Sequence, residues 1–192
     1  VYDTIENHGY YLYNIGDIVN NDNIYVNSMM SKRRLQLGFL SCMFFESVGF
    51  NLNGNIIWDK GQVQSKRNST VNLNSCYVKC INCYEHIFIL KKGNAQPDEY
   101  LSKVSRFSPV IKINSKGINT YKHTAPYPLE MVQLLKPFIP ESNDKYILDP
   151  FVGSGTTVMW CKEKNYKGVG FELNKEYYQL CVDKIFKKDL FN

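Results

Sequence analysis

Residues 147–157 read ILDPFVGSGTT, and this stretch decides the fold. Its apolar start, together with the two residues before it, predicts a short strand over 145–150. Gly153 and Gly155 predict a tight turn, because glycine adopts backbone angles that other residues resist. The apolar residues that follow have helical spacing from Thr156 onward. The stretch therefore predicts a strand, a glycine turn and a helix.

The residues after this helix repeat the alternation. The stretch KGVGFEL at 167–173 predicts a second strand, and Asn174 is expected to cap a last helix. An alternation of strand and helix predicts parallel strands joined by right-handed crossovers. In such sheets ligands bind beyond the carboxyl ends of the strands, where the start of a helix offers free N–H groups. The glycine turn is therefore the candidate binding site.

The earlier part of the chain predicts further elements of an α/β protein. One helix is expected to end at Gly49 and to bury Leu35, Phe39, Cys42 and Met43. Long polar loops are expected at 62–82 and 94–122. The predicted strands are 9–19, 54–61 and 84–93, and the predicted helices are 31–48 and a second one that begins at Pro128.

Three kinds of ligand compete for the glycine turn. A phosphate-binding loop needs a lysine directly after its second glycine, and none follows Gly155. A dinucleotide fingerprint needs a third glycine where Val158 stands. S-adenosylmethionine needs an acidic residue at the end of the next strand for its ribose hydroxyls, and Glu172 lies there, 17 positions after Gly155. The residues favour S-adenosylmethionine, with a turn that binds nothing as the alternative.

The motifs DPFVGSGTT and GVGFEL resemble the cofactor motifs of the DNA amino-methyltransferases, which modify adenine-N6 or cytosine-N4. The segment HTAPYPLEMVQLL at 123–135 resembles the family segment that precedes the glycine motif. This order matches the circularly permuted β class, as do GNIIWDKG at 54–61 and YEHIFILKKG at 84–93. The resemblance implies a Rossmann-like class I S-adenosylmethionine-dependent methyltransferase fold, α/β with a mostly parallel, circularly permuted sheet that is incomplete in this chain.

The resemblance also implies one methyltransferase domain over 1–192. Residues 1–93 would form its target-side half, 94–122 a linker or target-recognition loop, and 123–192 its cofactor-binding half. Tyr127 stands where the family usually has phenylalanine. The implied cofactor-binding residues are Asp149, Phe151, Gly153, Gly155, Thr156 and Glu172, with Thr124, Ala125 and Pro128 from the preceding segment.

The family's catalytic tetrapeptide, Ser/Asn/Asp-Pro-Pro-Tyr/Phe, is not found in the sequence. The nearest match, TAPYPL at 124–129, has Ala125 where a hydrogen-bonding side chain is needed and opens a predicted helix. The catalytic residues therefore stay unknown. In the permuted class the tetrapeptide precedes the region that resembles 9–19, which would place it before Val1. We expect a missing N-terminal segment or a complementary subunit to supply it, and we expect the isolated chain to be inactive.

Charge and composition allow a nucleic-acid partner. The 192 residues carry a formal net charge of +5. The sequence contains no run of 18 apolar residues, so no membrane span is indicated. No secretory leader opens the chain, so we expect a cytoplasmic protein. Double-stranded DNA is the expected partner. Its expected contacts are Lys66, Arg67, Asn68 and Ser69 in the first long loop, with the basic run 32–34 as a further candidate.

Cysteines give a weaker signal. Thiolate and imidazole ligands suit zinc, but the spacing of Cys76, Cys80, Cys83 and His86 fits no common zinc pattern. Buried thiols are therefore favoured, and no metal is expected. No cysteine follows a proline, which disfavours methylation at cytosine-C5.

The sequence therefore predicts methylation of an exocyclic amino group in DNA within a restriction–modification system. Cytosine-N4 is favoured over adenine-N6 from the look of the segment WDKGQVQSKRNST at 58–70. Methylation of RNA or protein is one alternative. A non-catalytic partner subunit that binds cofactor and DNA is the other.

Overall fold

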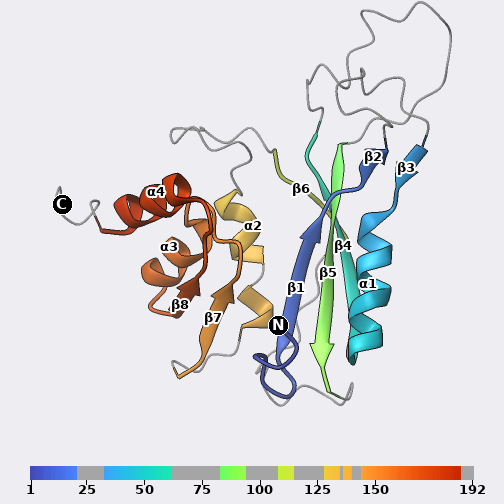
Figure 1. The fold of residues 1–192 in the computed structure, drawn as a ribbon, viewed down its shortest axis with the longest axis horizontal. Coiled ribbons are helices and arrows are strands. Elements are labelled where there is room, and N and C mark those ends of the chain that lie inside the picture. Colours follow the sequence, from blue (N-terminus) through green and yellow to red (C-terminus); the bar gives the residue numbers. More distant parts are fainter. Residues whose placement is uncertain are drawn as a thin grey trace, which may run out of the picture. The chain divides into compact units, whose positions relative to one another are not determined.

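The computed structural model describes residues 1–20, 33–61, 83–93, 108–114, 128–134, 136–139 and 144–186. The chain divides into two compact units. Unit 1 comprises Val1–Asp98 and Arg106–Asn114, and unit 2 comprises Glu99–Ser105 and Ser115–Asn192. In Figure 1 the described elements of unit 1 run from blue to yellow-green, and those of unit 2 from yellow to red. No helix in the described ranges is long and apolar enough to cross a membrane.

The main sheet of unit 1 has the strand order β1-β5-β4-β6. β5 pairs antiparallel with both of its neighbours, and β4 pairs parallel with β6. Six consecutive residues of β5 are buried, which is typical of a strand covered on both faces. A separate antiparallel pair joins β2 to β3. The bounds are β1 Tyr10–Ile15, β2 Ile18–Asn20, β3 Arg33–Leu35, β4 Phe50–Asp59, β5 Tyr84–Lys92 and β6 Val110–Lys112.

Helix α1 (Leu37–Val48) runs alongside β4 and β5, as Figure 1 shows. Gly38 allows close approach, because a Cβ there would lie 3.0 Å from the Phe88 ring. The helix ends at Gly49, with φ of 116°, as predicted. Beneath α1 lies a core of Cys42, Phe50, Phe88 and Leu90.

The predicted buried face of α1 is only partly right. Cys42 is buried, but Phe39 and Met43 are exposed. The helix also begins at Leu37 and not at residue 31, because 33–35 form β3. Since α1 is apolar nearly all round, spacing alone could not select its buried side.

Unit 2 has a two-stranded parallel sheet, β7-β8, with Tyr146 opposite Lys167 and Asp149 opposite Gly170. Its core contains Val132, Trp160 and Cys161. The Trp160 ring stacks on Tyr166, with ring centroids 5.4 Å apart. The bounds are α2 Leu129–Leu134, the 3-10 helix η2 Lys136–Phe138, β7 Tyr146–Asp149, α3 Thr156–Glu163, β8 Lys167–Gly170 and α4 Lys175–Phe186.

The α/β class is confirmed, and so is the parallel pair that was predicted around the glycine turn. The expected predominance of parallel strands does not hold for the described ladders, because three of the five are antiparallel. The segment 94–122, expected to be a linker, contains β6. A three-residue strand is too short to leave a pattern in the sequence, and only its pairing with β4 defines it.

Each unit buries one of the two tryptophans of the chain. Trp58 of β4 is 4% exposed, and its indole N–H donates to the Ile113 carbonyl at 2.8 Å. This bond ties β4 to the segment that follows β6. Trp160 of α3 is 1% exposed.

Candidate functional site

The turn after β7 has the backbone that its glycines predict. Gly153 has φ of 53° and Gly155 has φ of 87°, in the left-handed region that favours glycine. The Gly155 N–H donates to the Val152 carbonyl at 2.8 Å, and the Gly155 carbonyl accepts from the Met159 N–H at 2.9 Å. Gly155 is therefore the N-cap of α3. As no side chain caps this helix, its first-turn N–H groups have no side-chain acceptor among the described residues.

Backbone bonds join the turn to the segment that follows β8. The Phe171 N–H donates to the Asp149 carbonyl, and the Val152 N–H donates to the Phe171 carbonyl, both at 3.0 Å. Gly170 permits this approach, since a Cβ there would lie 2.8 Å from the Val152 Cβ. Both strand ends are thus held together at the carboxyl edge of the sheet.

The Glu172 carboxylate bridges two backbone groups. Its Oε2 accepts from the Gly153 N–H at 2.9 Å, and its Oε1 accepts from the Asn174 N–H at 2.8 Å. Each oxygen keeps a further lone pair. The carboxylate can therefore shape the turn and still accept hydrogen bonds from a ligand.

Asp149 begins the turn. Its Oδ1 accepts from the Phe151 N–H at 3.0 Å, which fixes the chain direction after β7. Thr156, the first residue of α3, is buried.

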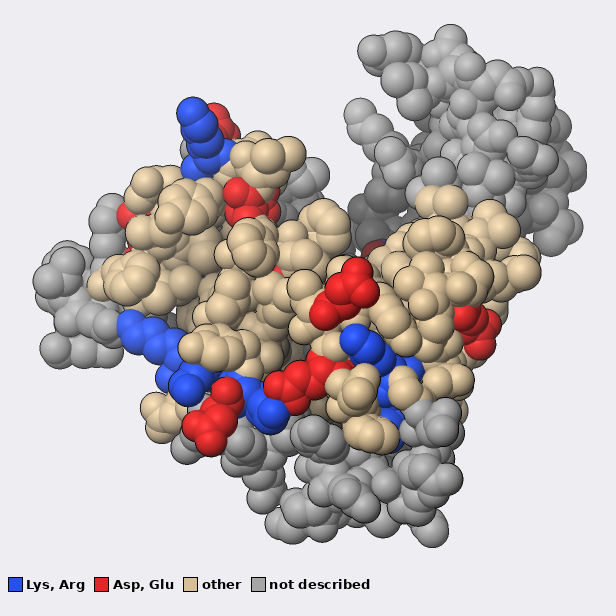
Figure 2. Space-filling model, turned by 60° about the horizontal axis from the view of Figure 1, so that its bottom comes forward, with Lys and Arg blue, Asp and Glu red and all other residues tan. Residues whose placement is uncertain are grey.

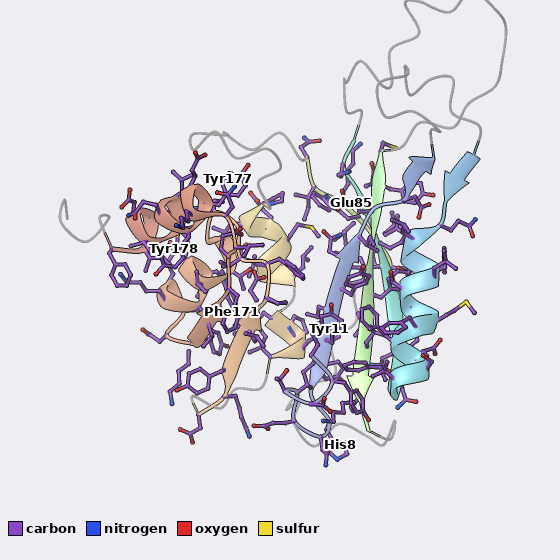
Figure 3. The ribbon with its side chains drawn as sticks, viewed as in Figure 1. His8, Tyr11, Glu85, Phe171, Tyr177 and Tyr178 are labelled. Atoms are coloured by element: carbon purple, nitrogen blue, oxygen red, sulfur yellow. The ribbon has the colours of Figure 1, made fainter. Side chains whose placement is uncertain are left out.

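Large apolar side chains are exposed around this edge. Phe151 is 86% exposed, Leu173 is 100% exposed, and Phe171, labelled in Figure 3, is 61% exposed. Phe171 and Leu173 flank Glu172 directly. Sequence reasoning missed both as site residues, because the strand was expected to continue to 173, whereas β8 ends at Gly170. The arrangement can bind a ligand that combines hydroxyl donors with an apolar or planar part.

The structure brings Asp149, Phe151, Gly153, Gly155, Thr156 and Glu172 together around one turn of unit 2. Pro128 immediately precedes α2, and its carbonyl accepts from the Met131 N–H at 3.1 Å. Thr124 and Ala125 lie outside the described residues. The four predicted DNA contacts, 66–69, also lie outside them. Acidic and basic side chains are interspersed on the face that Figure 2 presents.

His86 is a packed core residue. It is 4% exposed, stacks on Phe88 at 5.3 Å and lies beside the Asn55 amide, whose nitrogen is 3.2 Å from its Nδ1. Burial lowers the pKa of His86, against a smaller opposing effect of Asp17. Cys83 is described, whereas Cys76 and Cys80 are not. Within the described ranges, no group of three or more His, Cys, Asp or Glu side chains could hold a metal ion.

Comparison with known proteins identifies the family. A family model described as DNA methylase, covering N6 and N4 methyltransferases, matches residues 1–183. The Type II beta methyltransferase M.BslI of Bacillus sp. (strain NEB-606) is 41% identical over 185 residues, which cover 91% of this chain. The chain spans only 20% of the length of that relative.

Solved structures agree on the fold. TTHA0409 of Thermus thermophilus, complexed with S-adenosyl-L-methionine, superposes with a TM-score of 0.65 at 20% identity, over 97% of this chain and 72% of that one. The PvuII DNA methyltransferase, described as cytosine-N4-specific, gives a TM-score of 0.63 at 19% identity, over 91% and 62% of the two chains. The fold, the sequence motifs around the glycine turn and the match over nearly the whole length lead to one conclusion. This chain belongs to the DNA methylase family of N6 and N4 methyltransferases.

Proposed function

We propose that this chain binds S-adenosylmethionine at the glycine turn and serves a site-specific DNA amino-methyltransferase of a restriction–modification system. One observation carries the proposal: the Glu172 carboxylate is held by the Gly153 and Asn174 N–H groups at the carboxyl edge of the parallel pair. A bound ligand at this edge meets a carboxylate whose direction is already fixed.

The donor set fits this cofactor. Glu172 offers acceptors for the ribose hydroxyls, and the α3 N-terminus offers N–H groups. The exposed Phe171 and Leu173 offer apolar contact to a planar base. Asp149 orders the start of the turn. When bound, S-adenosylmethionine would supply an electrophilic methyl group, which an exocyclic amine attacks in line as the C–S bond breaks, with S-adenosylhomocysteine and the proton of the amine as the other products.

The proposal also includes the other residues that the sequence predicts to bind cofactor or DNA. Thr124, Ala125 and Pro128 form the preceding cofactor segment. Residues 66–69, in the segment between β4 and β5, contact DNA phosphates. Residues 123–192 act as the cofactor-binding half, 1–93 as the target-side half, and 94–122 as a linker or as part of target recognition. As part of such a restriction–modification system, the protein would act in the cytoplasm.

The proposal assigns base binding to polypeptide outside these residues. Within the described part of the chain, β7 pairs only with β8, and β1 pairs only with β5, so each has one edge without a ladder. Tyr146 and Leu148 of β7 are also exposed. A strand with the catalytic tetrapeptide, from a missing segment or a complementary subunit, satisfies the β7 edge. The isolated chain is then expected to bind cofactor without turnover.

Cytosine-N4 is proposed as the modified position, ahead of adenine-N6. The support for this choice is the overall look of the segment WDKGQVQSKRNST at 58–70. Mass spectrometry of nucleosides from methylated DNA distinguishes N4-methylcytosine from N6-methyladenine, and N6-methyladenine alone would contradict the assignment.

Calorimetry with S-adenosylmethionine tests the cofactor site. Wild-type chain is expected to bind, and Glu172→Ala is expected to weaken binding by about tenfold or more, because two backbone bonds and the ligand acceptors are lost together. Glu163→Ala, which removes an exposed carboxylate of α3, is the matched control. No binding by wild type, or equal binding by Glu172→Ala, contradicts the proposal.

A transfer assay with radiolabelled cofactor tests the substrate class. Duplex DNA, RNA and protein are offered to the chain together with the polypeptide that carries the tetrapeptide. Label in DNA supports the proposal. Label only in RNA or protein supports the other enzyme class, and cofactor binding with no transfer supports a non-catalytic subunit.

A further inference from the structure

Gly155 lies against the buried thiol of Cys181. A Cβ at Gly155 would lie 2.5 Å from the Cys181 Sγ, 3.2 Å from its Cβ and 3.3 Å from its Cα. Real Cβ atoms essentially never approach another heavy atom below 3.0 Å. Cys181 is 6% exposed, so its side chain fills the space directly beneath the turn.

The thiol is a neutral packing group. Burial raises the pKa of Cys181, and the Asp149 and Glu172 carboxylates raise it further, against an opposing effect of Lys184. A thiol that stays protonated is a poor nucleophile. Its closeness to the turn therefore indicates a mechanical role.

Helix α4 is connected to both glycines of the turn, to Gly155 directly through Cys181 and to Gly153 through Glu172 and Asn174. Glu172 joins the Gly153 N–H to the Asn174 N–H, and the Asn174 side chain caps α4 by accepting from the Glu176 and Tyr177 N–H groups. Cys181 lies seven residues after this cap, two turns along, on the same side of the helix. The contacts form a closed ring that runs from Gly153 through Glu172, Asn174, α4 and Cys181 to Gly155.

We propose that Cys181 is a positioning residue for the cofactor turn. Its sulfur fixes the position of Gly155 relative to α4. It thereby sets the direction in which the first N–H groups of α3 point toward a ligand. The inference rests on the proposed function, since the ligand is S-adenosylmethionine. A larger side chain at 181 lifts the turn, and a smaller one lets it relax.

Cys161 offers a matched control in the same unit. It is 1% exposed and also packs against a glycine, because a Cβ at Gly168 would lie 2.9 Å from the Cys161 Cβ and 3.1 Å from its Sγ. That contact fixes α3 on β8 and does not involve the glycine turn. Cys161 variants therefore report the cost of disturbing a buried Cys–Gly contact away from the ligand.

A double-mutant cycle tests the inference by calorimetry with S-adenosylmethionine. Gly155→Ala alone is expected to weaken binding by about tenfold or more, from the clash and from its left-handed backbone. Adding Cys181→Ala removes the 2.5 Å contact and leaves the 3.2 Å one. It is expected to recover about threefold of the affinity, with the strain of the positive φ remaining. Adding Cys161→Ala instead is expected to recover nothing.

A second variant covers the case in which Gly155→Ala does not fold. Cys181→Val adds bulk from below and is expected to weaken binding by about fivefold, while Cys161→Val leaves the affinity within about twofold. Circular dichroism and thermal unfolding establish that each variant is folded. Equal affinities for folded Cys181 and Cys161 variants, or no recovery in the cycle, overturn the inference. Failure of wild type to bind S-adenosylmethionine overturns the proposed function itself, and the two failures are distinguished by that measurement.

Discussion

The Gly153 N–H donates a 2.9 Å hydrogen bond to the Glu172 Oε2, across 19 residues of sequence. Because the second carboxylate oxygen accepts from Asn174, one side chain fixes the turn and the start of α4 together. Glu172 thus has a structural role before any ligand arrives, and its substitution should show in an apo measurement.

Glu172→Gln keeps one acceptor oxygen and replaces the other with an NH₂ group, which cannot accept. It is expected to lower the free energy of unfolding by about 1–2 kcal/mol in the absence of cofactor. Urea titration followed by circular dichroism measures the change. Glu163→Gln, on the exposed side of α3, should stay within about 0.5 kcal/mol of wild type. Equal midpoints for both variants would show that the bridge contributes nothing.

Asn174→Ala removes the cap of α4. Its Oδ1 accepts from the Glu176 N–H at 2.8 Å and the Tyr177 N–H at 3.3 Å. The expected loss is about 1 kcal/mol in the free energy of unfolding, and Asn174→Ser should recover most of it, since serine caps nearly as well. Urea titration checks both variants. A serine variant no better than alanine would argue against the cap.

Unit 1 is expected to lose stability in mild acid through His86. Burial lowers its pKa in the folded chain, so the unfolded chain binds the proton more readily. The contribution of neutral, buried His86 to the free energy of unfolding is fully present above the ordinary histidine pKa of about 6.5, and it is lost as pH falls below that value. Thermal unfolding measured from about pH 5 to about pH 8 should therefore show a positive slope that His86→Gln reduces.

The two sides of α1 are expected to differ in their tolerance of change. Met43 is 67% exposed, so Met43→Lys should alter the free energy of unfolding by about 0.5 kcal/mol or less. Cys42, its neighbour, is buried against Phe88 and Leu90, so Cys42→Lys places an unpaired charge in the core and should prevent folding. Urea titration separates the outcomes, and similar costs for both variants would contradict the assigned orientation.

Local sequence signals predicted unit 2 well. β7 lies within the predicted 145–150, α3 begins at the predicted Thr156, and the turn glycines and the Asn174 cap also follow from patterns within a few residues of each feature. Glu172 lies two residues beyond the end of β8, close to the strand end where it was predicted. The Gly49 end of α1 was predicted for the same reason.

Features that depend on distant contacts were missed. β6 exists only through its pairing with β4, and the start of α1 was displaced by the pairing of β3 with β2. The contact of Cys181 with Gly155 joins residues 26 positions apart and has no sequence signature. The exposure of Phe171 and Leu173 depends on where β8 stops pairing with β7. Patterns of hydrophobicity specify elements, whereas tertiary pairing decides which side chains a site presents.

Because each unit buries one tryptophan, intrinsic fluorescence can report on the unfolding of each unit separately. Trp58 and Trp160 are both shielded from water, so unfolding of either unit shifts one fluorophore toward longer emission wavelength. Trp58→Phe leaves Trp160 to report on unit 2, which contains the turn that is proposed to bind cofactor, and Trp160→Phe leaves Trp58 to report on unit 1. Coincident transitions in the two single-tryptophan chains would mean that the units melt as one cooperative body, and separated transitions would mean that each melts alone.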